Sequence, residues 1–299
     1  MSLLSVMVCI TTFTFKVAFT AADAPELLRG VAILNPFVVS TSSLSLVVHA
    51  RIVFVGIAQL LAYTVYYHSP WNRKADRTGT LPIFYLSVGG LNENLASPMD
   101  EDAIRDELTG PAFMSSLHDL ISLLLVTQSR VSNIPIFLIF YTQLGVLQRD
   151  YFLSPSDLTA TSMLLQYSSF FVLGGSNAIS SVDLSNAYNG IAGYNVLAVG
   201  LLTFISNWAG PIWWVSGTTL LMSPSIKRQA AFEHFTLLTL FTTFSTLSVM
   251  VACTVLREHL FIWTVFSPKF LFTIAWVMGN HVIVNGLFGY GLLGTLLPT

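Results

Sequence analysis

Long apolar runs alternate with short polar breaks along the whole chain. A helix needs about 20 apolar residues to cross the hydrocarbon core of a bilayer. The runs predict an all-α fold, a polytopic integral membrane bundle with about eight transmembrane helices. Whether 31–48 forms a further span, a re-entrant piece or an interfacial helix stays open. The expected spans lie at 2–21, 52–67, 113–127, 132–148, 157–174, 194–222, 232–255 and 270–290.

The same pattern predicts one polytopic membrane domain over 1–299, with N-terminal helices in 1–68 and a C-terminal helical core in 113–299. Between them, 69–112 is the one long hydrophilic stretch, and it ends in an acidic cluster over 100–107. The spacing of these acids fits no EF-hand, so a solvated, partly helical cytoplasmic loop is expected. A start inside an apolar run suits a retained helix, and it leaves open whether the chain is complete or a fragment.

Local signals refine several of these helices. Asp157, which follows Ser154 and Pro155, is expected to cap the helix over 157–174. The tight connection over 127–133 predicts that the helices on either side of it are antiparallel neighbours. His118 and Asp119 are adjacent near the start of the expected 113–127 helix, and they suggest a local cap rather than a proton relay.

The 194–222 run is longer than a bilayer requires and contains Gly210 and Pro211. A proline inside a helix removes one backbone hydrogen bond, so this run predicts a kinked helix. The carbonyls freed beside Asn207 could bind a ligand, or neighbouring helices could satisfy them. Both interpretations stay open.

Basic residues suggest which side of the membrane each connection faces. Seven lie in connections on one side and three on the other, so the first side is expected to be cytoplasmic. This places 175–193, which contains no lysine or arginine, on the luminal side. The seven are Arg73, Lys74, Arg77, Arg105, Arg149, Lys227 and Arg228, and the three are Arg130, Arg257 and Lys269.

Composition narrows the functional classes. Only 9% of residues are charged, whereas soluble domains carry about 25%, so a soluble globular domain is excluded. A net charge of −2 gives no reason to expect a nucleic-acid partner. The six histidines are scattered, and no metalloprotease, nucleophile-elbow or phosphate-loop motif occurs. We therefore predict no catalytic residue and no metal ligand in this chain.

The most unusual stretch is 174–214, where polar residues stand between long apolar runs. Polar side chains at membrane depth are costly unless they line a cavity or meet partners, so they suggest a functional site. An ordinary solvated loop followed by a membrane helix would give the same pattern. Asn177, Asp183 and Asn186 lie in the first polar island, and Asn207 and Trp208 lie in the second.

Three separated motifs carry a family resemblance: GGSNAISSVDLSNAYNG at 174–190, FISNWAGPIWW at 204–214 and REHLFIWTVFSPKF at 257–270. In this order they resemble the C-terminal membrane region of GPI ethanolamine phosphate transferases, and most closely the fungal-like branch that modifies the second mannose. The resemblance extends from the FKVAFTAADAPELL stretch at 15–28 to the end of the chain. The family's catalytic part is a luminal, alkaline-phosphatase-like domain with a metal-bound threonine nucleophile, and nothing in this chain resembles it.

The resemblance implies a multi-pass protein of the endoplasmic reticulum membrane. Such a protein would position lipid-linked GPI for phosphoethanolamine transfer to the second mannose. Whether this chain is itself an enzyme stays open. No cofactor is expected in it, because the divalent metal, expected to be zinc, belongs to the family's catalytic domain. The partners implied are membrane lipids, the GPI intermediate, phosphatidylethanolamine and a small membrane subunit.

Eight residues are candidates for contact with these lipids. The amides and the carboxylate could bind sugar hydroxyls or an ammonium group, and the three basic residues could pair with a lipid phosphate. The basic residues could equally extend from helix ends to the interface. A non-catalytic scaffold is the alternative function, and a small-solute transporter would require an internal repeat that is not visible. The candidates are Asn177, Asp183, Asn186, Asn207, Trp208, Arg257, His259 and Lys269.

Overall fold

A computed structural model describes residues 3–23, 25–28, 44–68, 101–149, 154–175, 182–222, 228–259, 274–276 and 278–279. Every regular element in these ranges is a helix, which confirms the predicted all-α class. Three of the described helices are long and apolar enough to cross a membrane, and a bent pair would make a fourth. The total of eight spans stays a prediction, because most of 270–290 and all of 31–43 lie outside the described residues.

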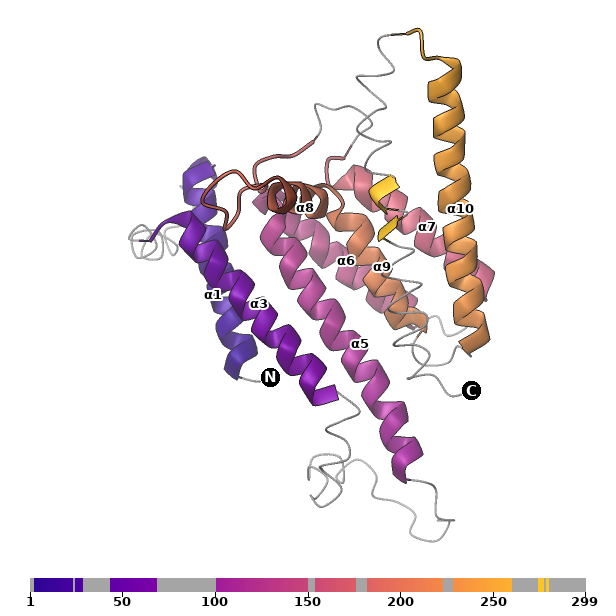
Figure 1. Cartoon of the computed structure of the whole chain (residues 1–299). Helices are drawn as coiled ribbons and strands as arrows, with labels where there is room; N and C mark the ends of the chain where they lie inside the picture. The colour runs from indigo at the N-terminus through magenta and orange to yellow at the C-terminus, as the bar shows by residue number, and fades with distance from the viewer. Residues whose placement is uncertain are drawn as a thin grey trace.

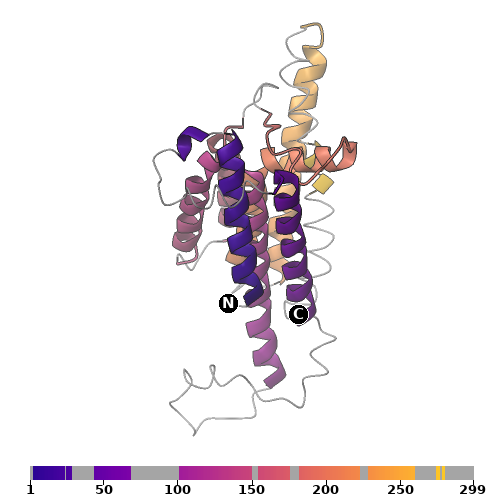
Figure 2. The same cartoon turned by 90° about the vertical axis from the view of Figure 1, so that its left-hand side faces the viewer.

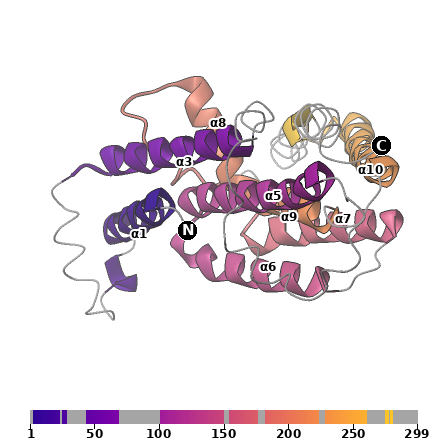
Figure 3. The same cartoon turned by 90° about the horizontal axis from the view of Figure 1, so that it is seen from below.

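Seven of the described helices form a bundle; six of them run up and down with a similar tilt, whereas α10 is inclined to them in Figure 1 and is seen nearly end-on in Figure 3. One further helix, α8 (Val196–Asn207), lies across one end of this bundle (Figure 2). Short 3₁₀ turns, η1 (Pro25–Leu27) and η3 (Val131–Asn133), lie in connections at that same end. The seven are α1 (Leu3–Asp23), α3 (Leu46–His68), α5 (Glu101–Gln128), α6 (Ile134–Leu147), α7 (Pro155–Val172), α9 (Ala209–Met222) and α10 (Arg228–Val255).

Helices α1, α3 and α5 share one apolar core. A Cβ on Gly56 of α3 would lie 2.8 Å from a methyl group of Val8, so the absence of a side chain lets α1 and α3 approach closely. The cluster contains Val8, Phe15, Phe19, Ala50, Val53, Ile57, Leu60 and Leu120.

A second core joins α5, α6 and α9. Its largest members are Trp213 and Trp214 of α9, both fully buried, which pack against Phe140 of α6 with ring centroids 5.4 and 5.7 Å apart. Helices α5 and α6 run in opposite directions, as the short connection predicted, and they meet through side chains (Figure 1). Helix α9 packs closely against both α5 and α7.

Two local predictions, the caps assigned to Asp157 and His118, need correction. Helix α7 is capped by Ser154, whose hydroxyl accepts the N–H of Asp157, so Asp157 lies in the first turn and is not the cap. Helix α5 begins at Glu101, so the acidic residues of the partly helical loop continue the helix of the expected 113–127 span. His118 therefore lies within α5, buried and hydrogen-bonded to Ser216 of α9, and it caps nothing.

The predicted kink is present and is sharper than a proline usually makes. Helices α8 and α9 meet at Trp208 and are bent by 70°. In a continuous helix the ring of Pro211 would clash with the carbonyl of the residue four positions earlier, Asn207, and this is where α8 ends. Pro211 then lies in the first turn of α9, where no intrahelical N–H donor is required.

Candidate functional site

The end of the bundle that carries α8, called here the α8 end, gathers segments from distant parts of the sequence. The last residues of α1, α5 and α7 and the first residues of α3, α6 and α9 meet there (Figure 1). The segment 182–195 leads directly into α8 at this end (Figure 2). Both polar islands predicted from the sequence, as far as they are described, therefore lie together.

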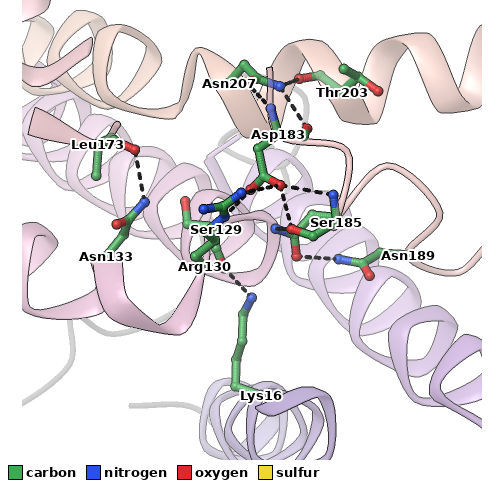
Figure 4. A network of polar contacts seen from close by, with 11 residues as sticks. Lys16, Ser129, Arg130, Asn133, Leu173, Asp183, Ser185, Asn189, Thr203 and Asn207 are labelled. Atoms are coloured by element: carbon green, nitrogen blue, oxygen red, sulfur yellow. Dashed lines mark hydrogen bonds and ion pairs between the residues drawn. The ribbon is translucent and has the colours of Figure 1, made fainter. Parts of the chain in front are cut away.

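Asp183 is the centre of the polar contacts at this end (Figure 4). Arg130 donates two hydrogen bonds to its carboxylate, at 2.9 Å from Nε to Oδ2 and 3.1 Å from Nη2 to Oδ1. Ser185 donates to Oδ1 through its backbone N–H at 3.0 Å and its hydroxyl at 2.6 Å. A two-point arginine–carboxylate pair fixes orientation as well as distance, so Asp183 links the segment to the end of α5.

The charge of Asp183 is stabilised by these donors. Burial raises the pKa of Asp183, but the hydrogen bonds from Arg130 and Ser185, together with the Arg130 charge, outweigh that effect and hold the pKa below its ordinary value. The hydrogen bond to Asp183 and its negative charge in turn raise the pKa of Arg130. The side chain of Arg130 is 59% exposed and that of Asp183 is 16% exposed, so the pair lies at the surface of the α8 end.

Asn207 holds the same residue from the other side. Its Oδ1 accepts the backbone N–H of Asp183 at 2.8 Å, and its Nδ2 donates to the carbonyl of Asp183 at 3.0 Å (Figure 4). The Nδ2 group also donates to the carbonyl of Thr203 at 2.8 Å, within α8. One side chain thus satisfies both backbone groups of Asp183, which fixes the segment against the end of α8.

The remainder of the segment docks on α3. Asn186 is fully buried; its Nδ2 donates to the Ser185 hydroxyl and its Oδ1 accepts from Asn189. Gly190 has a φ of +77°, a conformation that favours glycine. Its carbonyl accepts from Nε of Arg51 on α3 at 2.8 Å. The segment is therefore fixed on α5, α8 and α3.

Two residues of this arrangement were not among the candidates predicted from the sequence. Lys16 of α1 is 5% exposed, and its ammonium donates to the carbonyl of Ser129 at 2.6 Å while lying 5.3 Å from the ring centroid of Phe19. Arg130 was considered only as a topology marker. A lysine inside an apolar run is a signal in itself, since charges in spans usually face the bundle interior. Its partner is not visible in the sequence.

Trp208 occupies the corner between α8 and α9 and is 8% exposed. Its ring stacks on Phe204 with centroids 6.0 Å apart and contacts Phe170 of α7 at 4.8 Å. The structure therefore places Trp208 inside the bundle end, where it supports α8, and not on an open surface.

Two of the remaining candidates, Arg257 and His259, lie apart from Asp183. Helix α10 continues past the level of α8 in Figures 1 and 2, and Arg257 and His259 follow its last turn, both exposed. Asn177 and Lys269 lie outside the described residues. Of the eight candidates, the structure brings together Asp183, Asn186, Asn207 and Trp208.

The arrangement is suited to holding a chain segment rather than to bond-breaking chemistry. Within the described ranges, no group of three histidine, cysteine, aspartate or glutamate side chains could hold a metal ion. The metal that the family resemblance implies therefore does not fit the residues seen at the α8 end.

Comparison with known proteins gives a consistent result. A family model described as the GPI ethanolamine phosphate transferase membrane region matches residues 1–296. The Aspergillus oryzae protein named GPI ethanolamine phosphate transferase 2 is 45% identical over 270 residues, which are 90% of this chain and 28% of that protein. The protein of the same name from Aspergillus fumigatus is 50% identical over 197 residues, 65% of this chain and 23% of that protein.

A more distant relative of the same name, from Saccharomyces cerevisiae, is 39% identical over 186 residues, 56% of this chain and 22% of that protein. The chain thus spans about a quarter of the length of these relatives. No solved structure matches it. The resemblance drawn from the three motifs is confirmed.

Proposed function

Because the chain belongs to the GPI ethanolamine phosphate transferase membrane-region family, we propose that it forms the membrane part of an enzyme that transfers phosphoethanolamine to a GPI glycolipid precursor. In this proposal the protein lies in the endoplasmic reticulum membrane with the α8 end toward the lumen. The acceptor is the second mannose, which the three motifs favour by their resemblance. The divalent metal and the reacting groups are proposed to belong to another part of the enzyme.

The observation that supports this proposal is the fixation of 182–190 at the α8 end. Arg130 and Asn207 hold Asp183 from two sides, and Arg51 holds Gly190. A fixed polar surface at the bundle end can orient sugar hydroxyls and exclude alternative poses of a lipid-anchored glycan. Orientation of a reactant contributes strongly to rate, and a displacement of about 1 Å can cost roughly 100-fold.

The side assignment also has a physical basis. Arg149 and Arg228 border the connections at the end opposite α8, and the seven-to-three count of basic residues in the connections of the sequence favours that end as cytoplasmic. At the α8 end, Lys16, Arg51 and Arg130 are each held by polar contacts within the bundle. Basic residues favour the cytoplasmic side of a membrane protein. The α8 end is therefore proposed to be luminal, the side on which the family resemblance expects the catalytic domain.

The test joins this whole chain to the upstream part of the Aspergillus oryzae relative and expresses the fusion in yeast depleted of its own GPI ethanolamine phosphate transferase 2. GPI precursors labelled with mannose are then resolved by mass to find phosphoethanolamine on the second mannose. Asp183→Asn and Arg130→Gln should each lower that product about tenfold or more, because the segment loses its fixed position. Arg149→Gln, an exposed arginine at the opposite end, is the matched control.

The outcomes separate the alternatives. An active fusion whose Asp183→Asn and Arg130→Gln variants retain full transfer, at equal protein level, overturns the role of the fixed segment. A fusion that restores membrane assembly of other subunits but leaves the precursor unmodified overturns the transferase assignment and supports the scaffold.

A further inference from the structure

A groove of about 400 Å³ runs between α1 and α3 on the outside of the bundle. Both helices are candidate membrane spans, so this groove opens toward the bilayer. Its floor is closed where Gly56 meets Val8. The lining is almost entirely apolar, and it includes Met7, Thr11, Val48, Arg51, Ile52 and Val55.

Arg51 is the one charged residue of this lining. It lies in the second turn of α3, and its Nε donates to the carbonyl of Gly190 at 2.8 Å, so the guanidinium extends toward the α8 end. Its two terminal amino groups meet no hydrogen-bond partner within the described residues. Arginines that contact lipids lay their aliphatic stem along an apolar surface and extend the charged group to the polar interface. Arg51 has this arrangement.

The combination of shape and charge indicates the ligand. A guanidinium with free amino groups binds phosphate oxygens through two parallel hydrogen bonds. No carboxylate is among the described residues that line the groove, so a headgroup ammonium has no partner among them. We propose that the groove binds one acyl chain of an anionic phospholipid, such as phosphatidylinositol, whose phosphodiester is held by Arg51.

The readout of this inference requires no turnover, so it can hold or fail independently of the transferase assignment. Once the lipid is bound, Arg51 would contact the lipid phosphate and the carbonyl of Gly190 at the same time, so a bound lipid would be linked to the polar segment. If Arg51 only anchored the segment, lipid binding in the groove would not depend on the headgroup. The two roles therefore differ in a measurable way.

The test uses the purified full chain in phosphatidylcholine nanodiscs that contain phosphatidylinositol with a photoreactive group in its acyl chain. After illumination, labelled peptides are mapped by mass spectrometry. We expect label on the groove faces of α1 and α3, around Thr11 and Ile52. Unlabelled phosphatidylinositol should compete with this label, whereas added phosphatidylcholine should not.

Arg51→Gln should reduce groove labelling about tenfold, because the loss of one charge-assisted hydrogen-bonded contact to the phosphate lowers the affinity by about that factor. Arg51→Lys should retain part of it, and Arg149→Gln should leave it unchanged. Val55→Trp fills the groove without changing charge and should also remove the label, so the test survives if Arg51→Gln does not fold. Equal labelling of all lipid-facing helices, or label that is insensitive to headgroup and to both variants, overturns the proposal.

Discussion

The interior of the bundle and the α8 end use polar side chains in opposite ways. In the interior, Ser162 of α7 and Thr218 of α9 share a hydrogen bond at 3.0 Å, and His118 contacts Ser216 at 2.8 Å. These groups are buried and join one helix to another. At the α8 end, Asp183 and Arg130 are charged and partly exposed, and they join a non-helical segment to helix ends.

The two regions differ in whether a polar group keeps a hydrogen-bond partner after its partner on another element is removed. Thr218 and Ser216 also donate to carbonyls of their own helix, at Trp214 and Trp213. Their hydroxyls therefore stay satisfied without the neighbouring helix. The carboxylate of Asp183 depends on Arg130 and on Ser185 within the same segment. Interior polar contacts should therefore add little to stability, whereas contacts at the α8 end should decide where the segment lies.

Packing, rather than interior hydrogen bonding, should give the largest effect. A Cβ on Gly210 of α9 would lie 2.7 Å from the hydroxyl of Ser169 and 2.9 Å from its backbone carbon. Gly210→Ala should therefore push α9 from α7 and destabilise the bundle by about 1–3 kcal/mol, as overpacking does. Thermal unfolding in nanodiscs measures this. Gly200→Ala on α8, where a Cβ meets nothing within 4 Å, is the matched control and should be neutral or slightly stabilising.

Loss of Asn207 should be the largest change at the α8 end. Asn207→Ala leaves the backbone N–H and carbonyl of Asp183 without their side-chain partner, at a cost of about 1–3 kcal/mol for such groups. Amide hydrogen exchange over 183–190 should become faster while exchange in α5 and α9 stays slow. Ser206→Ala, the neighbouring residue, should change neither. Unchanged exchange in Asn207→Ala would contradict the assigned role.

Acid should release the same segment only at low pH. The folded-state pKa of Asp183 lies below its ordinary value of about 3.9, so its stabilisation is complete above that value and is lost as pH falls further. Exchange over 183–190, corrected for intrinsic rates, should stay constant from pH 7 to about 5 and rise below about 4. Asp183→Asn should abolish this response. A midpoint near neutral pH would show that another group controls the segment.

The smallest effect should come from an interior hydroxyl. Thr218→Val preserves shape, and Ser162 keeps its hydrogen bond from Gln166. Hydrogen bonds between membrane helices average about 0.6 kcal/mol, so the melting temperature should hardly change. A loss that exceeds the effect of Asn207→Ala would reverse the comparison between the two regions.

The sequence predicted those features that depend on local order. Apolar runs located α1, α3 and α10, and Pro211 located the break in 194–222. It did not reveal that α8 lies across the bundle, because one apolar run fits both a bent span and a helix at the end. Nor did it show where in the partly helical loop before 113 the helix α5 begins, since acidic residues lower the hydropathy although they continue the helix.

Only part of the candidate site could be predicted, because the sequence shows local clusters but not which distant residues meet. Clustered amides and an aspartate indicated that 174–214 was unusual, and Asp183 and Asn207 do meet. Arg130 lies 53 residues from Asp183 and Lys16 lies 113 residues from Ser129, and nothing in spacing or periodicity links residues so distant. Such pairs arise only when the helices pack.

The corner at Trp208 has a mechanical consequence. Because the Trp208 ring contacts both Phe204 of α8 and Phe170 of α7, a change in the tilt of α8 would disturb the packing against the last turn of α7. Helix α7 in turn contacts α10 through Tyr167 and Ser245, whose hydroxyls lie 3.2 Å apart. A molecule that lifts the 182–190 segment would therefore be expected to disturb the C-terminal part of α7 and its contact with α10 as well.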